Sequence, residues 1–387
     1  MKILLDATEI KLDRLFASIP VYIQRYLSAI PFEERQNYIL LINPDCKSFF
    51  NIKYPGFQLI SFKFSGWNKF WPFNPLYLYT LYKFNKFIDK EKFDTIFIPS
   101  DYPIYLQNKL KCKKVIVIHD LKGIKQSSDT VKNSIKSYMT YRMYKRHLES
   151  ADEIIAISKY TQQDILTYYP QICESKVHVV YNSVTLSNKA KRPIALKEKK
   201  YILYVNTLYR YKNIKTLVKA YNIILNEIDY DLVVVGKYTE HWENELIPYI
   251  IKNKLDDRIT HLQGLSSEEL RYLYENASLF VTPSLNEGFG FTPIEAAICR
   301  CPVISSIEEA LVDSTHGMLN YYYPAMDECA LAKKIKSVIL NPPSSDKLNE
   351  ISSYFKMIFS PADQQKKISE ILDGKKNEYK RFTHNFL

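Results

Sequence analysis

Short, continuous apolar runs alternate along this sequence with segments whose apolar residues recur at helical spacing. Strands that are apolar on both faces are typical of parallel sheets, because helices cover such sheets on both sides. The alternation therefore predicts a doubly wound α/β architecture in which helices connect successive strands. It runs from the amino terminus to about Val180, stops, and starts again at Tyr201.

We expect the strands at the apolar runs, at residues 2–6, 38–42, 58–64, 95–98, 115–118, 153–157, 176–180, 201–205, 231–235, 259–262, 278–282 and 302–304. The main helices are expected over 19–30, 75–88, 131–148, 214–228 and 327–340. Ser266 and Glu269 predict a capping box at the start of one more helix.

The length of 387 residues predicts two domains, because a single hydrophobic core seldom serves so long a chain. Residues 183–200 are polar and basic and lack periodicity, which indicates a linker. We therefore expect one Rossmann-like domain over 1–184 and a second over 185–358. Ligands of such sheets bind at the carboxyl ends of the strands, so two facing domains predict a binding cleft between them.

The positive charge belongs to the first half of the chain. Residues 1–200 hold 32 Lys and Arg against 18 Asp and Glu, a net charge of +14, whereas the whole chain carries +11. Aromatic residues are interleaved with these lysines, namely Phe62, Phe64, Trp67, Phe70, Trp71, Phe73, Tyr77, Tyr79 and Phe84. The pattern fits either a solvated basic surface or docking on an anionic membrane surface. No nucleic-acid-binding motif accompanies the charge, so nucleic acid is not an expected partner.

Several classes of protein are disfavoured by missing motifs. The six cysteines form no CxxC pair, and there is no P-loop, HExxH, GxSxG, or GxGxxG after the first strand. The apolar run at Met1–Leu5 is too short for a signal peptide, and no run of 18 apolar residues occurs. We expect a protein that acts in the cytoplasm, with neither export by a signal peptide nor a membrane span.

The loop before residue 291 has the features of a phosphate site. It joins an expected strand to a helix start and contains Gly288 and Gly290, although the chain has only nine glycines. Backbone amides at a helix amino terminus favour phosphate binding. Thr292 and Glu295, with Pro293 between them, predict a capping box. Glu287 has no such local role, so we interpret it as a carboxylate that binds sugar hydroxyls.

Two other segments contain candidate functional residues. Arg210 and Lys212 lie just before the most regular helix of the chain, where cations oppose the helix dipole. A bound diphosphate would offset the charge of these two cations. In the alternative interpretation they are solvated charges of a surface loop. His119 directly follows an apolar strand, at the end where a ligand would lie, and is either functional or structural.

The segment 287–295 resembles the pair of glutamates, separated by seven residues, of the retaining glycosyltransferases of family 4, which have the GT-B fold. The resemblance covers nearly the whole second half and, more weakly, the first half from about Val115. Supporting segments are 118–120, 151–158, 179–182, 205–213 and 301–305.

The resemblance implies a role for each matching residue. Arg210 and Lys212 would neutralise the donor diphosphate, with Thr207 in the same donor-binding loop. Glu287 would hold the donor sugar, and His119 would reach the reacting sugar from the first domain. The donor-binding loop would also include Gly288, Phe289, Gly290 and Phe291, with Glu295 at the nucleotide ribose.

The resemblance also implies a reaction. Such enzymes retain the anomeric configuration and need no metal and no cofactor besides the nucleotide diphosphate sugar. Their last helix commonly crosses back onto the first domain, for which residues 359–372 are the candidate within a segment of about 359–387. The expected activity is transfer of a hexose, for example from GDP-mannose or a UDP-sugar, to a glycan or lipid-linked glycan of a surface polysaccharide or lipopolysaccharide.

Departures from the family pattern leave two alternatives open. Residues 13–20 contain no glycine, Asn206 and Arg300 replace glycines, and Tyr211 replaces an arginine. A nucleotide-sugar epimerase of the same fold would convert a donor without an acceptor. A nucleotide-sugar-binding subunit without turnover would bind a donor and transfer nothing.

Overall fold

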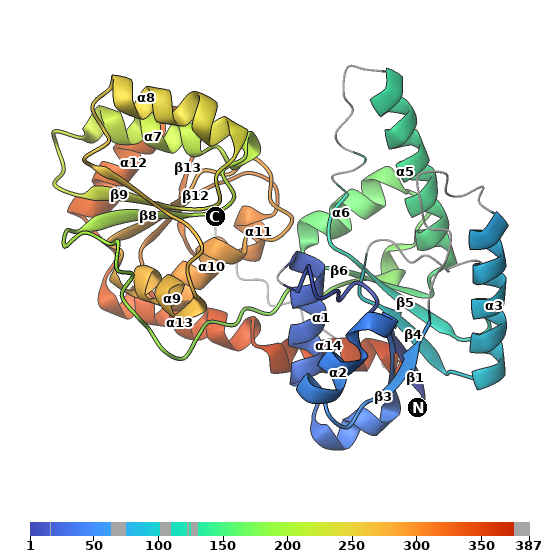
Figure 1. Cartoon of the computed structure of the whole chain (residues 1–387). Coiled ribbons are helices and arrows are strands. Elements are labelled where there is room, and N and C mark those ends of the chain that lie inside the picture. The colour runs from blue at the N-terminus through green and yellow to red at the C-terminus, as the bar shows by residue number, and fades with distance from the viewer. Residues whose placement is uncertain (16, 63–74, 101–109, 122–123, 125–130, 375–387) are drawn as a thin grey trace. The chain divides into compact units, whose positions relative to one another are not determined.

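The computed structural model describes residues 1–374 except 16, 63–74, 101–109, 122–123 and 125–130 (Figure 1). The chain divides into two compact units. Unit 1 comprises residues 1–157, 161–183 and the chain from Pro361 onward, and unit 2 comprises residues 158–160 and 184–360.

Unit 1 is built on a seven-stranded parallel sheet of order β3-β2-β1-β4-β5-β6-β7. Its strands are β1 (Ile3–Asp6), β2 (Tyr38–Ile42), β3 (Gln58–Ser61), β4 (Thr95–Ile98), β5 (Lys113–Ile118), β6 (Glu153–Ala156) and β7 (Val177–Val179). Its helices are α1 (Ser18–Ala29), α2 (Lys47–Lys53), α3 (Pro75–Glu91), α5 (Val131–Ser150), α6 (Lys159–Tyr168) and α14 (Pro361–Leu372).

Both faces of this sheet are covered. Alternate strand residues such as Leu4 and Ile96 form one core with Phe84 of α3 and Leu148 of α5. The other face is covered by α1, where Tyr26 lies edge-on to Phe97 with ring centroids 5.2 Å apart. Burial on two sides is the reason why β2 and β4 are almost entirely apolar, whereas the edge strand β3 is exposed at both ends.

Unit 2 contains a six-stranded parallel sheet of order β10-β9-β8-β11-β12-β13. Its strands are β8 (Tyr201–Val205), β9 (Asp231–Val235), β10 (Ile259–Leu262), β11 (Leu279–Thr282), β12 (Val303–Ser306) and β13 (Asn320–Tyr322). Its helices are α7 (Ile214–Ile224), α8 (Ile247–Lys252), α9 (Ser267–Asn276), α10 (Phe291–Ile298), α11 (Leu311–Ser314), α12 (Glu328–Leu340) and α13 (Ser345–Ile358).

Helices α7, α8 and α12 lie over one face of this sheet, and α9, α10 and α13 lie over the other (Figure 1). The chain winds outward from β8 in one direction and from β11 in the other, so the winding reverses between these neighbouring strands. The carboxyl ends of strands at such a switch point are the usual ligand site of a doubly wound sheet.

The structure confirms the predicted α/β fold class, with two doubly wound Rossmann-like sheets. Five strands have the predicted bounds, namely β2, β4, β8, β9 and β10. The capping box of Ser266 and Glu269 at the start of α9 is also present. Helices α2, α8, α11 and α13 and strand β13 were not predicted, and α7 ends at Ile224, four residues before the predicted end at 228.

The end of unit 2 lies beside its beginning. The amide of Val184 donates to the carbonyl of Phe359 at 2.8 Å. A new helix, α14, starts at Pro361 rather than at 359, because proline favours the first helical position and disfavours helical backbone at the residue before it. Within unit 1, α14 is held to the end of the first sheet, where Gln364 donates to the carbonyl of Tyr181 at 3.2 Å.

Part of the predicted basic and aromatic surface lies outside the described residues, including Phe64, Trp67, Phe70, Trp71 and Phe73, and so does the basic tail at 375–387. Among the described members, Tyr79 is exposed, whereas Phe84 is fully buried in the core of unit 1 and cannot contact a membrane. Within the ranges that the structure describes, no helix has the length and apolar character needed to cross a bilayer.

Candidate functional site

The candidate site of unit 2 is formed by loops that follow the carboxyl ends of β8, β11 and β12. These three strands are consecutive in the sheet order, so their loops emerge side by side. Residues 206–213 follow β8, residues 283–290 follow β11, and residues 307–310 follow β12.

Lys212 and Glu287 form an ion pair at the centre of these loops. The ammonium of Lys212 lies 2.6 Å from Oε1 of Glu287, and the two side chains are only 8% and 13% exposed. The amide of Asn206 donates to the same oxygen at 3.0 Å. An ammonium has three N–H donors, so Lys212 can bind Glu287 and still donate to a second anion.

The β8 loop holds Lys212 in place through Asn213, which has a positive φ of 56°. Its side-chain amide donates to the carbonyls of Pro283 and Ala325 at 3.0 and 2.8 Å, and its oxygen accepts from Thr216 at 2.7 Å. The β8 and β11 loops are therefore tied together next to the ion pair. Our sequence analysis missed Asn213, although an asparagine between a basic pair and a regular helix is a signal for a left-handed residue.

Gly290 sets the direction in which the chain enters α10. Its φ is +89°, and an added Cβ would lie 2.7 Å from Cδ2 of Leu311, so the fold requires glycine here. Helix α10 begins at Phe291 with Gly290 as N-cap. Phe289 is buried beside Phe291, with ring centroids 4.9 Å apart, and this packing holds the loop against the start of α10. Gly288, between the anchored Phe289 and Glu287, is half-buried.

The predicted capping box of Thr292 and Glu295 is wrong. Thr292 lies within the first turn of α10, because the left-handed conformation of Gly290 starts the helix earlier. Glu295 instead accepts a hydrogen bond from the hydroxyl of Tyr274 on α9 at 2.9 Å. Burial, together with the charge of Glu295, raises the pKa of Tyr274 well above its usual value.

Arg210 does not join Lys212 at Glu287. Its side chain is 77% exposed and pairs with Glu245, which also lies 3.0 Å from Lys215 and 3.3 Å from His241. Glu245 belongs to a π-helical turn at Trp242–Leu246, and its hydrogen bond from Lys215 lowers its pKa. The exposed Thr207 contributes its backbone amide to the side chain of Asn206 at 2.9 Å.

Glu309 is a residue of the candidate site that our sequence analysis missed. It lies in the β12 loop with a φ of +48°. Its two carboxylate oxygens accept from the backbone amide of Glu287 at 2.9 Å and from the side-chain amide of Asn286 at 2.8 Å. No motif marks it in the sequence, and only the adjacency of β11 and β12 in the sheet brings it to Glu287.

His119 follows β5 at the carboxyl edge of the first sheet, as expected. Its Nε2 lies 3.1 Å from the carbonyl oxygen of Pro99, so this nitrogen carries a proton. Burial lowers the pKa of the imidazole, which favours the neutral form. The edge of Tyr22 packs on the ring at a centroid distance of 4.9 Å.

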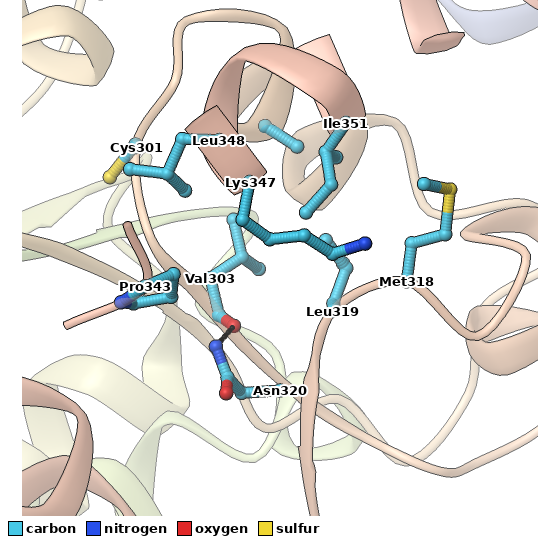
Figure 2. Close-up of a pocket in the computed structure, with 10 residues that line it drawn as sticks. Cys301, Val303, Met318, Leu319, Asn320, Pro343, Lys347, Leu348 and Ile351 are labelled. Atoms are coloured by element: carbon cyan, nitrogen blue, oxygen red, sulfur yellow. Dashed lines mark hydrogen bonds between the residues drawn. The ribbon is translucent and has the colours of Figure 1, made fainter. Parts of the chain in front are cut away.

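A separate cavity of about 210 Å³ lies at the opposite, amino-terminal edge of the second sheet (Figure 2). It is lined mainly by apolar side chains near the starts of β12 and β13 and on α13, and Lys347 extends across it. It lacks the carboxylates and amides of the loops around Glu287, so we do not assign the site to it. Among the described residues, no group of three or more His, Cys, Asp or Glu is arranged to hold a metal ion.

Comparisons with known proteins agree with this geometry. Residues 187–354 match the family model for glycosyl transferases group 1, and residues 55–188 match the model for Glycosyltransferase Family 4. Each model matches less than half of the chain, and together they span residues 55–354. The segment that matches the glycosyl transferases group 1 model contains all of the loops around Lys212 and Glu287.

Two curated relatives are O-antigen mannosyltransferases. One, RfbU from Salmonella typhimurium, is 29% identical over 61% of this chain and 64% of its own length. The other, mannosyltransferase B from Escherichia coli, is 28% identical over 52% of this chain and 55% of its own length. The chain thus matches less than two-thirds of either relative.

Solved structures share the fold across both units. HepE from Anabaena in complex with UDP has a TM-score of 0.72 at 15% identity, covering 97% of this chain and 100% of its own. The lipopolysaccharide outer core galactosyltransferase WaaB has a TM-score of 0.67 at 16% identity, covering 97% of this chain and 100% of its own. The GT-B glycosyltransferases are therefore the structural neighbours of this chain.

Proposed function

We propose that this protein is a glycosyltransferase that moves a hexose from a nucleotide diphosphate sugar to a glycan acceptor in the synthesis of a surface polysaccharide or lipopolysaccharide. The observation that carries the proposal is the buried Lys212–Glu287 pair at the switch point of the second sheet, next to the amino terminus of α10. A fixed cation and helix amides suit a diphosphate, and a carboxylate suits sugar hydroxyls.

The proposed chemistry uses the charge of this site. Glycosyl transfer breaks the bond between the anomeric carbon and a diphosphate oxygen, so positive charge develops on the sugar and negative charge on the diphosphate. Lys212 would stabilise the leaving diphosphate together with the first-turn amides of α10. Glu287, held by Asn206, would hold a sugar hydroxyl. This arrangement supplies electrostatic stabilisation without a metal or a cofactor, and we propose that the reaction needs neither.

The other residues of the site would contact further parts of the donor. Arg210 can reach the diphosphate only by leaving Glu245, and we propose that it does so when the donor binds. Backbone groups of residues 288–291 and Thr207 would line the donor, and Glu295 would contact the ribose. The predicted role of His119 at the reacting sugar stays a prediction, as do the cytoplasmic location and the contact with an anionic membrane.

The donor is proposed from the relatives. Two of them are named as mannosyltransferases, which favours GDP-mannose as the first donor to test. UDP-glucose is the second candidate, because HepE was solved in complex with it. We also propose that the anomeric configuration is retained, on the resemblance of residues 287–295 to the glutamate pair of the retaining family.

The test is a thermal-shift panel of nucleotide sugars, followed by transfer assays with a glycan acceptor and NMR of the product anomer. We expect one donor to raise the melting temperature, and Lys212→Met and Glu287→Gln to abolish transfer. Transfer that is unchanged in both variants would show that the proposed site is wrong.

Two alternative functions, an epimerase and a non-catalytic subunit, are each distinguished by a different measurement. Conversion of the donor sugar without an acceptor would identify an epimerase. Donor binding with no transfer to any acceptor would favour a non-catalytic subunit, an alternative motivated by Asn206 and Arg300 at positions where the family has glycine. The hydrogen bond from Asn206 to Glu287 favours an intact site over a degenerate one.

A further inference from the structure

The strongest unexplained feature near the site is the segment 309–311, which contacts the β11 loop at both ends. At one end, Glu309 accepts from the backbone amide of Glu287 at 2.9 Å and from Asn286 at 2.8 Å. At the other end, Cδ2 of Leu311 lies 2.7 Å from the position that a Cβ on Gly290 would take. The segment 309–311 therefore contacts the β11 loop at Asn286, Glu287 and Gly290.

The backbone of Glu309 is unusual for the residue type. Its φ of +48° lies in the left-handed region, which glycine adopts readily and a residue with a side chain does not. A strained residue persists only where surrounding contacts compensate for it, and such residues cluster at functional sites. The compensating contacts of Glu309 include the two hydrogen bonds to its carboxylate, which are strengthened by its charge.

Those hydrogen bonds act on the backbone of Glu287 rather than on its side chain. The amide of Glu287 donates to Glu309, and its carbonyl accepts from the amide of Ala310 at 3.4 Å. Both backbone groups of Glu287 are thus fixed by the segment 309–311. Its side chain is held by Lys212 and Asn206, which bind the same oxygen.

We propose that Glu309 is a positioning residue that sets the backbone of Glu287, and with it the direction of the catalytic carboxylate toward the donor sugar. This inference rests on the proposed function for the role of Glu287, but the contact itself can be tested without any activity. Glu309 does not touch the substrate in this proposal. It acts through Glu287, because misplacing a reacting group by about 1 Å can lower a rate by about 10²-fold.

Two substitutions separate the effect of losing the Glu309 carboxylate from the effect of relaxing its strained backbone. Glu309→Gly removes both acceptors and relaxes the positive φ. Glu309→Gln keeps the shape and retains one oxygen for the amide of Glu287, but it loses the acceptor for Asn286. Glu308→Gln is the matched control, because it removes the same charge one position earlier from a side chain outside these contacts.

The first measurement compares the change in kcat with the change in the KM of the donor for each variant. We expect Glu309→Gly to lower kcat by about 10- to 100-fold and to change the KM of the donor by less than about threefold. Glu309→Gln should recover part of the loss, and Glu308→Gln should match the parent. Because relaxing the strain offsets lost hydrogen bonds, the melting temperature of Glu309→Gly should stay close to that of the parent. An unchanged kcat in Glu309→Gly would overturn the proposal, and so would a loss of kcat that simply follows a loss of folded protein.

The second readout is hydrogen exchange of the peptide that contains residues 283–290, measured on the full chain without donor. We expect faster exchange of the Glu287 amide in Glu309→Gly, intermediate exchange in Glu309→Gln, and parental exchange in Glu308→Gln. Equal protection in all four proteins would overturn the positioning role. If the Glu287 amide exchanges faster in Glu309→Gly but the parent protein transfers sugar from no donor, Glu309 still positions this loop. Only the proposed function would then be refuted.

Discussion

The ammonium of Lys212 and the carboxylate of Glu287 meet at 2.6 Å, although they lie on loops that follow different strands. Their strands, β8 and β11, are neighbours at the switch point of the second sheet. Because both side chains are nearly buried, each charge depends on the other for its stabilisation. Stability and the proposed chemistry therefore share the same pair of residues.

A double-mutant cycle should expose this dependence. Lys212→Met alone leaves the carboxylate of Glu287 without its paired cation, and Glu287→Gln alone leaves the ammonium of Lys212 without its paired carboxylate. We expect Lys212→Met to lower the free energy of unfolding by about 3 kcal/mol. The double variant should be less destabilised than the sum of the single variants. Urea denaturation measures all four free energies. Additive effects would show that the two charges are independent.

Arg210 should behave differently from Lys212. Arg210 is exposed and its pair with Glu245 is solvated, so Arg210→Ala should change the free energy of unfolding by less than about 1 kcal/mol. If Arg210 moves to the diphosphate, the same variant should raise the KM of the donor. Glu245→Gln should lower that KM, because it removes the competing carboxylate. The opposite sign for Glu245→Gln would argue that Glu245 holds Arg210 in its working position.

Gly290→Ala should damage the site more than its backbone angle alone explains. An alanine would both strain a φ of +89° and push against Leu311. Gly317→Ala is the matched control, because its φ is +67° and nothing lies within 4 Å of an added Cβ. We expect a loss of about 1 kcal/mol for the control and at least about twice that for Gly290→Ala. Thermal unfolding compares the two, and equal losses would contradict the steric role of Leu311.

The stability of the protein should fall on mild acidification because of His147. Burial, with a smaller contribution from Arg146, lowers the pKa of His147 on α5 to about 4. An unfolded histidine titrates near 6.5, so the unfolded state binds the proton first. The stabilisation is complete above pH 6.5 and is lost as the pH falls toward 4, by about 3 kcal/mol at most.

Urea denaturation between pH 7.5 and 4.5 measures this slope. His147→Gln should flatten it, whereas His316→Gln, at an exposed position, should leave it as in the parent. A parental slope in His147→Gln would assign the pH dependence to other groups.

The strands were predictable because their apolar runs reflect burial on both faces, as in β2 and β9. Strand β13 escaped prediction because it is three residues long and begins with a polar asparagine. The start of α10 was mispredicted for a different reason. The pattern Thr292 to Glu295 is a sound local signal, but the packing of Leu311 against Gly290 decides where the helix begins.

Glu287 and Lys212 were both predicted as site residues from the sequence, whereas their pairing was not predicted. Contacts between loops depend on which strands are neighbours, and the order of strands in a sheet cannot be read from apolar runs. The same limit hid Glu309, which the sheet order places beside Glu287, and the partner of Arg210, which lies after another strand.

The hydrogen bond between Val184 and Phe359 has a consequence for protein engineering. Residues 184–360 of unit 2 are inserted between two segments of unit 1, and the entry and exit of this insertion are held side by side, so its two ends need no partner to remain closed. A fragment of residues 184–360 should thus fold without the rest of the chain and retain the proposed donor site. If nucleotide sugars stabilise this fragment as they stabilise the parent, donor recognition is a transplantable module that can be exchanged between relatives at a single pair of junctions.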